Sequence, residues 1–341
     1  MTAIATLGSH CALQVLKGAK DEGFSTLLVC EKKREKLYRR FGFIDELILV
    51  DSFNDITNQQ CSSKLKESDA IIIPHGTLIS QMSSSEIESL TTPIFGNKWI
   101  LRWESDRNMK EKLMLESKLN VPRSLSSSKE INGLAIAKRH GAAGGKGYFL
   151  TTGEKDYKKK RDKLIAKGII KGDGDLYLQE YAFGVSAYLQ YFYSPVKTEI
   201  EFFGVDRRYE SDIDGLGRIP AQQQIEIDSI SSFNVVGNSP LVLRESLLDE
   251  VYSMGERFVD AAKRLVAPGM PGPFCLEGVY DENGKFTTFE FSARIVAGTN
   301  LYIDGSPYSD LLYNEPMSMG RRIAREIKIA KNENQLEKIV T

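Results

Sequence analysis

Three charged residues, Glu277, Glu290 and Arg294, lie in or directly after two short apolar, β-rich segments, 274–280 and 286–291. The residues between these segments, Asp281-Glu-Asn-Gly284, form a strong turn signal and predict a hairpin that brings the two glutamates together. Two carboxylates that face one point repel each other unless a proton or a divalent cation lies between them. Oxygen ligands suit Mg²⁺, which also binds phosphate oxygens. The pattern therefore indicates a metal site for phosphate chemistry, although a hairpin with solvent-facing glutamates is the commoner arrangement when it is considered alone.

A glycine-rich segment, Gly141-Ala-Ala-Gly-Gly-Lys146-Gly147, lies between two predicted strands, 134–138 and 148–151. Its backbone N–H groups are suited to phosphate oxygens, and Lys138 and Lys146 would neutralise phosphate charge. It is not a P-loop, because a strand rather than a helix follows and Lys146 precedes no Ser or Thr. A mobile hairpin tip with a solvated lysine is the alternative. The order of glycine hairpin, acidic strand 179–182 and two-glutamate hairpin is a much stronger signal than the loop alone.

The first hundred residues supply the elements that would position a second group of polar side chains. Strands are predicted at 3–7, 26–30, 46–50 and 70–73, with helices between them, as in a parallel sheet covered by helices. Ligands bind beyond the carboxyl ends of such strands, where His10 and Thr77 lie. A dinucleotide site is not expected, because GxGxxG is absent. His10 is interpreted as a ligand-binding residue against the alternative of a local loop contact, whereas a structural role is favoured for His75.

The remaining elements are predicted as follows. Residues 93–103 form a connection, 107–119 a helix and 124–128 a loop, and the charged segment 155–167 is a helix with a solvated face. Strands are expected at 176–180, 187–193 and 199–205, and a long helix at about 244–265.

Composition limits the classes of function. The chain has 341 residues, 45 Lys plus Arg against 46 Asp plus Glu, and four scattered cysteines without a CxxC pair. The charge balance argues against nucleic acid and acidic membranes as partners, and the cysteines argue for a reducing compartment. No signal peptide or membrane-spanning run is recognisable. A cytoplasmic enzyme or binding protein of two or three core-forming units is expected.

The order of these motifs resembles the ATP-grasp enzymes, and longer segments resemble one family among them. These segments are ATLGSH, PHGT, FGNKWILRWESDR, GGKGYF, VDRRYESDIDGLGRIP, CLEGVY and SPYSDLLYNEPMSMGRRIAREIKIA. They are similar to the archaeal formate-dependent 5-formaminoimidazole-4-carboxamide ribonucleotide (FAICAR) synthetases over essentially the whole chain. The resemblance implies an α/β class ATP-grasp fold with an N-terminal parallel-sheet lobe. It also implies a division into a pre-ATP-grasp domain, 1–98, and an ATP-grasp domain, 99–341, with a lid lobe at about 123–185 and a large lobe at about 186–341.

The resemblance also implies roles for individual residues. Glu277 and Glu290 would bind Mg²⁺ (or Mn²⁺), and Arg294 and Lys138 would act in catalysis. The ATP-binding residues would be Arg107, Lys138, Gly144, Gly145, Lys146, Glu180, Tyr181 and Glu210. The substrate 5-aminoimidazole-4-carboxamide ribonucleotide (AICAR) would be bound by His10, Thr77, Asn238 and, from a Gly-Leu-Gly-Arg loop, Arg218. Where many ATP-grasp enzymes have an asparagine two residues after the second glutamate, this chain has Ser292, a weaker ligand, so the number of metal ions stays open.

The implied reaction is the ATP- and formate-dependent formylation of AICAR through formyl phosphate, in purine biosynthesis. Formate is a poor acyl donor and the AICAR amine a weak nucleophile, so activation and positioning are both required. The expected partners are small molecules, ATP, formate and AICAR, with a homo-oligomer and without nucleic acid or membrane. Two alternatives remain: an ATP-grasp ligase for another carboxylate and amine, and a nucleotide-binding relative without turnover.

Overall fold

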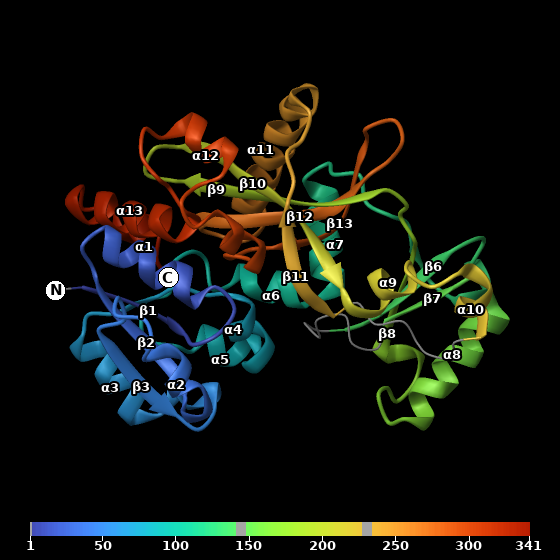
Figure 1. Ribbon diagram of the computed structural model, residues 1–341, viewed down its shortest axis with the longest axis horizontal. Coiled ribbons are helices and arrows are strands. Elements are labelled where there is room, and N and C mark those ends of the chain that lie inside the picture. The colour runs from blue at the N-terminus through green and yellow to red at the C-terminus, as the bar shows by residue number, and fades with distance from the viewer. Residues whose placement is uncertain (1, 141–147, 227–233) are drawn as a thin grey trace.

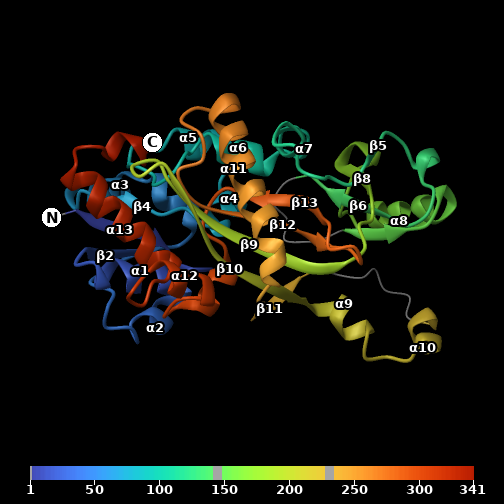
Figure 2. The same ribbon diagram turned by 90° about the horizontal axis from the view of Figure 1, so that it is seen from above.

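The computed structural model describes residues 2–140, 148–226 and 234–341, whose strands form three sheets (Figures 1 and 2). In Figure 1 the first sheet lies at one end of the molecule, the small sheet of β6, β7 and β8 lies at the other, and the large sheet spans the region between them. Both termini lie at the end formed by the first sheet.

The first sheet is parallel, as predicted, and its strand order is β3-β2-β1-β4. Strand β1 is buried along its whole length, which is typical of a parallel strand covered on both faces. The strands are β1 (Ala3–Leu7), β2 (Ser25–Glu31), β3 (Glu46–Val50) and β4 (Ile71–Ile72), and the helices are α1 (Ala12–Asp21), α2 (Glu35–Tyr38), α3 (Gln59–Glu67), α4 (Gly76–Gln81) and α5 (Ser84–Glu88).

Two consecutive helices lead away from this sheet. Helix α6 (Ile100–Ser105) occupies a segment that was predicted to be part of a connection, so that prediction was wrong. Ile100 and Leu101 are buried, and packing of this short apolar turn outweighs its weak local helix signal. Asp106 then begins α7 (Arg107–Glu116) as its N-cap, because its side chain accepts a hydrogen bond from Met109 N at 2.9 Å.

The small sheet has the order β5-β8-β6-β7 and a hydrophobic core of its own, shared with α8 (Glu154–Ala166). Its strands are β5 (Ser124–Leu125), β6 (Ala135–Arg139), β7 (Phe149–Thr151) and β8 (Leu176–Glu180). A loop was predicted for 124–128, and this was wrong at its start, where Ser124 and Leu125 pair with β8. A strand of two residues has too short a pattern to be recognised in the sequence.

The large sheet is antiparallel, with the order β11-β10-β9-β12-β13, and α11 (Leu248–Leu265) packs against it. Strands β9 and β10 run further than predicted, and β12 is buried at every position. The strands are β9 (Val185–Ser194), β10 (Glu199–Glu210), β11 (Val235–Pro240), β12 (Gly272–Tyr280) and β13 (Phe286–Ser292), and the short helices α9 (Ser211–Leu216) and α10 (Ala221–Glu226) follow β10.

The end of the chain returns to the first sheet. After α12 (Pro307–Leu312), helix α13 (Met319–Asn332) lies along α1, and Thr341 exchanges backbone hydrogen bonds with Ile94 at 2.9 and 3.0 Å. The last residues therefore pack with the N-terminal lobe, and the division at residues 98 and 99 stays a prediction. Within the described ranges, no helix has the length and hydropathy needed to cross a bilayer.

Candidate active site

A cavity of about 530 Å³ is lined by residues of the small and the large sheet, by residues of the helices α4, α6 and α7, and by His10, which follows strand β1. The structure brings most of the predicted site residues to this cavity: His10, Thr77, Arg107, Lys138, Glu180, Tyr181, Glu210, Asn238, Glu277, Glu290 and Arg294. Their roles stay predictions. These residues lie up to 284 positions apart in the sequence but line the same cavity, as residues of a common site must.

The floor of the cavity is one face of the large sheet. Glu277 on β12 lies directly opposite Glu290 on β13 and opposite Tyr188 on β9, while Arg208 on β10 lies opposite Asn238 on β11. Alternate residues of a strand share a face, so these side chains form a polar row across the strands. Arg208 stacks on Tyr188, with its guanidinium carbon 3.7 Å from the ring centroid.

Glu277 is buried and held on both oxygens. Its Oε1 accepts a hydrogen bond from Ser292 Oγ at 2.8 Å, and its Oε2 accepts one from Arg208 Nη1 at 2.8 Å. A buried carboxylate is stable only when it is paired in this way. The side chain is therefore fixed before any ligand binds.

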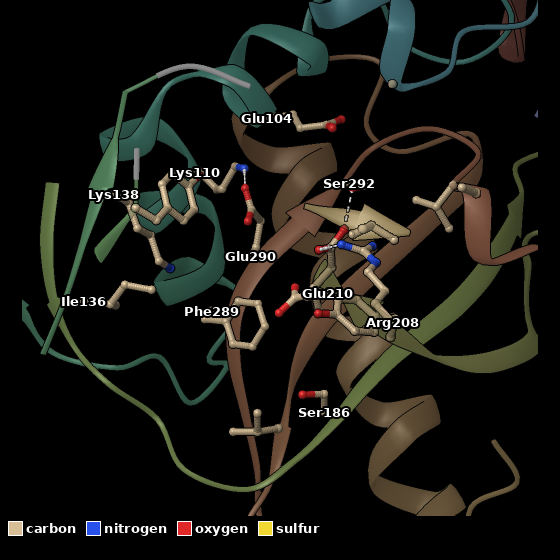
Figure 3. Close-up of a pocket in the computed structure, with 18 of the residues that line it drawn as sticks. Glu104, Lys110, Ile136, Lys138, Ser186, Arg208, Glu210, Phe289, Glu290 and Ser292 are labelled. Atoms are coloured by element: carbon tan, nitrogen blue, oxygen red, sulfur yellow. Dashed lines mark hydrogen bonds and ion pairs between the residues drawn. The ribbon is translucent and has the colours of Figure 1, made fainter. Parts of the chain in front are cut away.

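Glu290 is held from the other side by α7. Its Oε1 accepts hydrogen bonds from Arg107 Nη1 at 3.0 Å and Lys110 Nζ at 2.5 Å, and Figure 3 shows Lys110 lying over the carboxylate. Burial by itself would raise the pKa of Glu290, but the charges of Lys110, Arg107 and Lys138 outweigh it and hold the pKa well below its ordinary range. Glu290 is thus an anion across the neutral pH range.

The glutamate pair fits a hard divalent cation. Glu277, Glu290 and Ser292 offer only oxygen, and Glu290 Oε2 accepts no hydrogen bond from the residues that the structure describes. No group of three or more His, Cys, Asp or Glu side chains suited to a metal occurs in the described ranges. A cation at this pair would therefore complete its shell with water and phosphate oxygens, which is the usual mode for Mg²⁺.

Lys138 is buried beside the pair, at the end of β6. Its Nζ donates a hydrogen bond to Gln179 Oε1 at 3.1 Å and lies 5.3 Å from the centroid of the Phe289 ring. Burial lowers the pKa of Lys138 to about 8, although the negative charge of Glu290 acts in the opposite direction. Lys138 still carries its charge at neutral pH and can face an anion.

Arg294 and His10 lie together at the other end of the cavity. Arg294 Nη2 is 3.0 Å from Glu104 Oε1, and its buried Nε has no hydrogen-bond partner among the described residues. A Cβ added to Gly76 would lie 2.6 Å from His10 Nε2 and 3.5 Å from Arg294 Nη2, so the glycine makes this close approach possible. His10 has a φ of 54°, a left-handed conformation that is uncommon for residues other than glycine.

His75 has the structural role that the sequence favoured. Its Nε2 donates to Leu7 O at 2.9 Å, and its Nδ1 accepts from Thr77 N at 3.2 Å, capping α4. Burial lowers the pKa of His75 to about 4, so the ring is neutral and keeps this tautomer. The result is that Thr77 and Gly76 are fixed at the cavity.

The predicted nucleotide-reading segment lies at the end of β8. The backbone N–H groups of Glu180 and Tyr181 donate to Arg123 O and Leu134 O, at 2.9 and 3.0 Å, and Glu180 also pairs with the Arg123 side chain at 2.9 Å. Glu210, across the cavity, has its pKa raised to about 7, first by burial and then by the nearby Asp214. The side chain of Glu210 is thus poised to gain or lose a proton near neutral pH.

Four predicted residues remain: three fall outside the described ranges, and one lies away from the cavity. Gly144, Gly145 and Lys146 fall outside the described residues, so the structure does not place them. Arg218 is exposed after α9 and does not line the cavity. Arg208, ten residues earlier, does line it.

Three residues that line the cavity were not among the predicted site residues: Lys110, Glu104 and Arg208. Lys110 follows Arg107 by three residues on a predicted helix, so the two share a face, and this signal was available. Arg208 belongs to the alternation Asp206, Arg208, Glu210, which places three charged residues on one strand face. Glu104 lies between the predicted connection, 93–103, and the predicted helix, 107–119, so no predicted element positioned it.

Comparisons with known proteins place the whole chain in one family. Residues 156–341 match a family model described as "Domain of unknown function (DUF1297)", and residues 4–125 match one described as "Protein of unknown function (DUF1246)". A protein of Nitrosopumilus maritimus named 5-formaminoimidazole-4-carboxamide-1-(beta)-D-ribofuranosyl 5'-monophosphate synthetase is 68% identical over 341 residues, covering 100% of both chains. The protein of that name from Methanocaldococcus jannaschii is 46% identical, over 99% of this chain and 94% of its own.

Solved structures agree with this placement. The crystal structure of the IMP biosynthesis protein PurP from Thermococcus kodakaraensis superposes with a TM-score of 0.79 at 30% identity, covering 99% of this chain and 100% of that one. The ADP complex of purK, an N5-carboxyaminoimidazole ribonucleotide synthetase, reaches a TM-score of 0.68 at 13% identity, over 95% of this chain and 76% of its own. The second likeness supports the fold alone.

Proposed function

The chain belongs to the FAICAR synthetase family of ATP-grasp ligases, and on that premise we propose that it formylates the 5-amino group of AICAR with ATP and formate. The predicted family and fold class are confirmed by these relatives and structures. The proposed reaction has two steps. The γ-phosphoryl group of ATP moves to formate, giving ADP and formyl phosphate, and the amine of AICAR then attacks the formyl carbon and expels phosphate.

The observation that carries this proposal is the Glu277–Glu290 pair, set among Arg107, Lys110 and Lys138 in one cavity. A divalent cation bound there would offset charge on the phosphates during transfer. Cationic side chains of the protein would also bind the phosphates. Lys138, a buried cation, is suited to contact a phosphate oxygen. Arg107 and Lys110 hold Glu290 ionised and in place.

We assign the acyl-transfer end of the cavity to Arg294 and His10. Arg294 is anchored by Glu104 and is suited to a carboxylate or an acyl phosphate, both of which a guanidinium binds well. His10 and Thr77, at the carboxyl ends of parallel strands, are suited to AICAR. Walls from the small and the large sheet and from α4, α6 and α7 would restrict water, which would otherwise hydrolyse formyl phosphate.

Three finer points belong to the same proposal. The metal is Mg²⁺ or Mn²⁺, because both take oxygen ligands. Self-association is supported by exposed apolar side chains near α12, including Leu311 at 82% exposure. A cytoplasmic location fits the free, buried state of all four cysteines.

The reaction is tested by incubating the protein with ATP, Mg²⁺, formate and AICAR and measuring ADP and FAICAR. The proposal expects one FAICAR for each ADP, and no ADP above background without formate. ADP release with another carboxylate but not with formate would reject the assignment. ATP binding without any turnover would instead indicate a nucleotide-binding relative without catalysis.

Glu290→Gln tests the metal role. It keeps the shape of the side chain but removes the charge, so we expect kcat to fall by at least about a hundredfold while the Kd for AICAR changes less than about threefold. Glu282→Gln, at the exposed turn of the same hairpin, is the matched control and should behave as wild type. Equal losses of turnover and AICAR affinity in Glu290→Gln would contradict the role.

A further inference from the structure

Next to the cavity, on the same face of β10 as Arg208, lies a fully buried carboxylate, Asp206. Its Oδ1 accepts a hydrogen bond from Gln190 Nε2 at 2.6 Å, and its Oδ2 accepts one from Asn238 Nδ2 at 2.7 Å. Asp206 does not itself line the cavity, whereas Asn238 does. Any action of Asp206 on a ligand must therefore pass through Asn238.

The chemistry of the two side chains fixes which way the Asn238 amide faces. An ionised carboxylate only accepts hydrogen bonds, so it selects the NH₂ end of an amide and rejects the C=O end. The NH₂ group of Asn238 faces Asp206. The Oδ1 atom of Asn238 therefore points away from Asp206, and no described residue donates a hydrogen bond to it. Gln190 shows the same effect: its NH₂ is bound, and its buried Oε1 has no partner among the described residues.

The surroundings prevent Asp206 from turning away. Gly298 packs so closely that a Cβ there would lie 2.0 Å from Asp206 Oδ1. The carboxylate is thus enclosed between Gly298, Gln190 and Asn238. A carboxylate fixed on three sides is a rigid template for the amide it contacts.

We propose that Asp206 is a positioning residue that locks Asn238 with its carbonyl oxygen toward the substrate, so that the site requires an N–H donor on the imidazole. This inference rests on the proposed function, because AICAR supplies that donor as its 5-amino or its carboxamide NH₂ group. If a substrate placed an oxygen acceptor against Asn238 Oδ1, two acceptors would face each other and no hydrogen bond could form. Leaving a buried polar group unpaired is the strongest way for a site to reject an analogue.

A double-mutant cycle tests the relay. Asp206→Ala and Asn238→Ala should each raise the KM for AICAR about tenfold, with the KM for ATP unchanged, and the double variant should be no worse than Asn238→Ala alone. Glu199→Gln, an exposed change on the same strand, is the control. Additive losses in the double variant would show that Asp206 acts independently of Asn238 and would overturn the proposal.

A binding measurement keeps the proposal testable if Asp206→Ala does not fold. Two AICAR analogues are compared by calorimetry, one with a carboxylate in place of the carboxamide and one without the 5-amino group. In the wild type, at least one must bind about tenfold more weakly than AICAR, and in Asn238→Ala that penalty must disappear. The analogue that is penalised identifies the donor, whereas equal binding of all three ligands would overturn the proposal.

The amide orientation can also be read without any substrate. In the ligand-free protein, the side-chain NH₂ signal of Asn238, assigned with Asn238→Ala, should show slow hydrogen exchange in the wild type. If wild-type protein fails to convert AICAR but keeps this protection, the proposed function fails and the Asp206–Asn238 lock survives. If the protection is absent, the lock is wrong whatever the substrate.

Discussion

At the scale of single residues, Lys138 holds a positive charge in a buried position, where loss of hydration destabilises the charged form. It is only 5% exposed, and burial lowers its pKa to about 8 from the ordinary 10.5. Below this value the ammonium group is present and can face a phosphate, and above it the group becomes a neutral amine. In the free enzyme, ATP recognition by Lys138 is therefore present at low pH and lost as the pH rises through about 8.

The expected result is a fall in kcat/KM for ATP of up to about tenfold per pH unit above pH about 8, since this ratio reports the free enzyme. Lys138→Arg keeps a positive charge at every accessible pH and should move this alkaline limb upward, even if its maximum activity is lower. Lys112→Arg, exposed on α7, is the control. An alkaline limb that stays in place in Lys138→Arg would assign the titration to another group.

At the scale of elements, the first residue of α4 must lack a side chain. Gly76 is the first residue of this helix, and the space that its side chain would occupy is taken by the His10 ring. In Gly76→Ala the new methyl group would push the ring aside, since a side chain yields more easily than backbone. We expect the KM for AICAR to rise about tenfold, with the KM for ATP and the melting temperature almost unchanged.

Gly42→Ala provides the comparison for this change, because nothing lies within 4 Å of the position that a Cβ would take there. It should leave both KM values alone. A Gly76→Ala variant with normal AICAR kinetics would remove His10 from the substrate site.

Elements also explain what the sequence could and could not predict. The Glu277–Glu290 pair was predictable because a tight turn fixes the register of its two strands, and the register then determines which side chains meet. The contact of Glu290 with Lys110 joins elements 180 residues apart, and no local pattern specifies such a meeting. Helix α6, with Glu104, was missed because six residues give too short a periodic signal.

At the scale of the whole molecule, the numbers of acidic and basic residues are nearly equal, but charged residues are concentrated in the cavity. The cavity collects Arg107, Lys110, Lys138, Arg208 and Arg294, and each of them except Lys138 forms an ion pair with a carboxylate of the same cavity. Such pairs hold cations in place until an anionic substrate arrives. Their geometry depends on how α6 and α7 pack against the large sheet.

The C-terminal segment returns to the first sheet and so connects that sheet with the rest of the molecule. Where α1 crosses α13, Gly18 and Gly320 face the opposite backbones, and a Cβ on Gly18 would lie 2.1 Å from Arg321 N. Backbone cannot move aside as a side chain can, so Gly18→Ala must separate the two helices. We expect a loss of about 1–3 kcal/mol in the free energy of unfolding, the usual cost of overpacking, seen as a lower midpoint in urea.

Because α13 follows the large sheet in the chain and packs on the first, its displacement should weaken both lobes together. Gly18→Ala should therefore lower the midpoint of a single cooperative transition, followed by circular dichroism and by the fluorescence of Trp99 and Trp103. Lys17→Ala, which removes only an exposed pair with Asp21, should cost less than about 0.5 kcal/mol. Two separate transitions in Gly18→Ala, with only the first lobe destabilised, would show that α13 belongs to that lobe alone and does not couple it to the rest of the molecule.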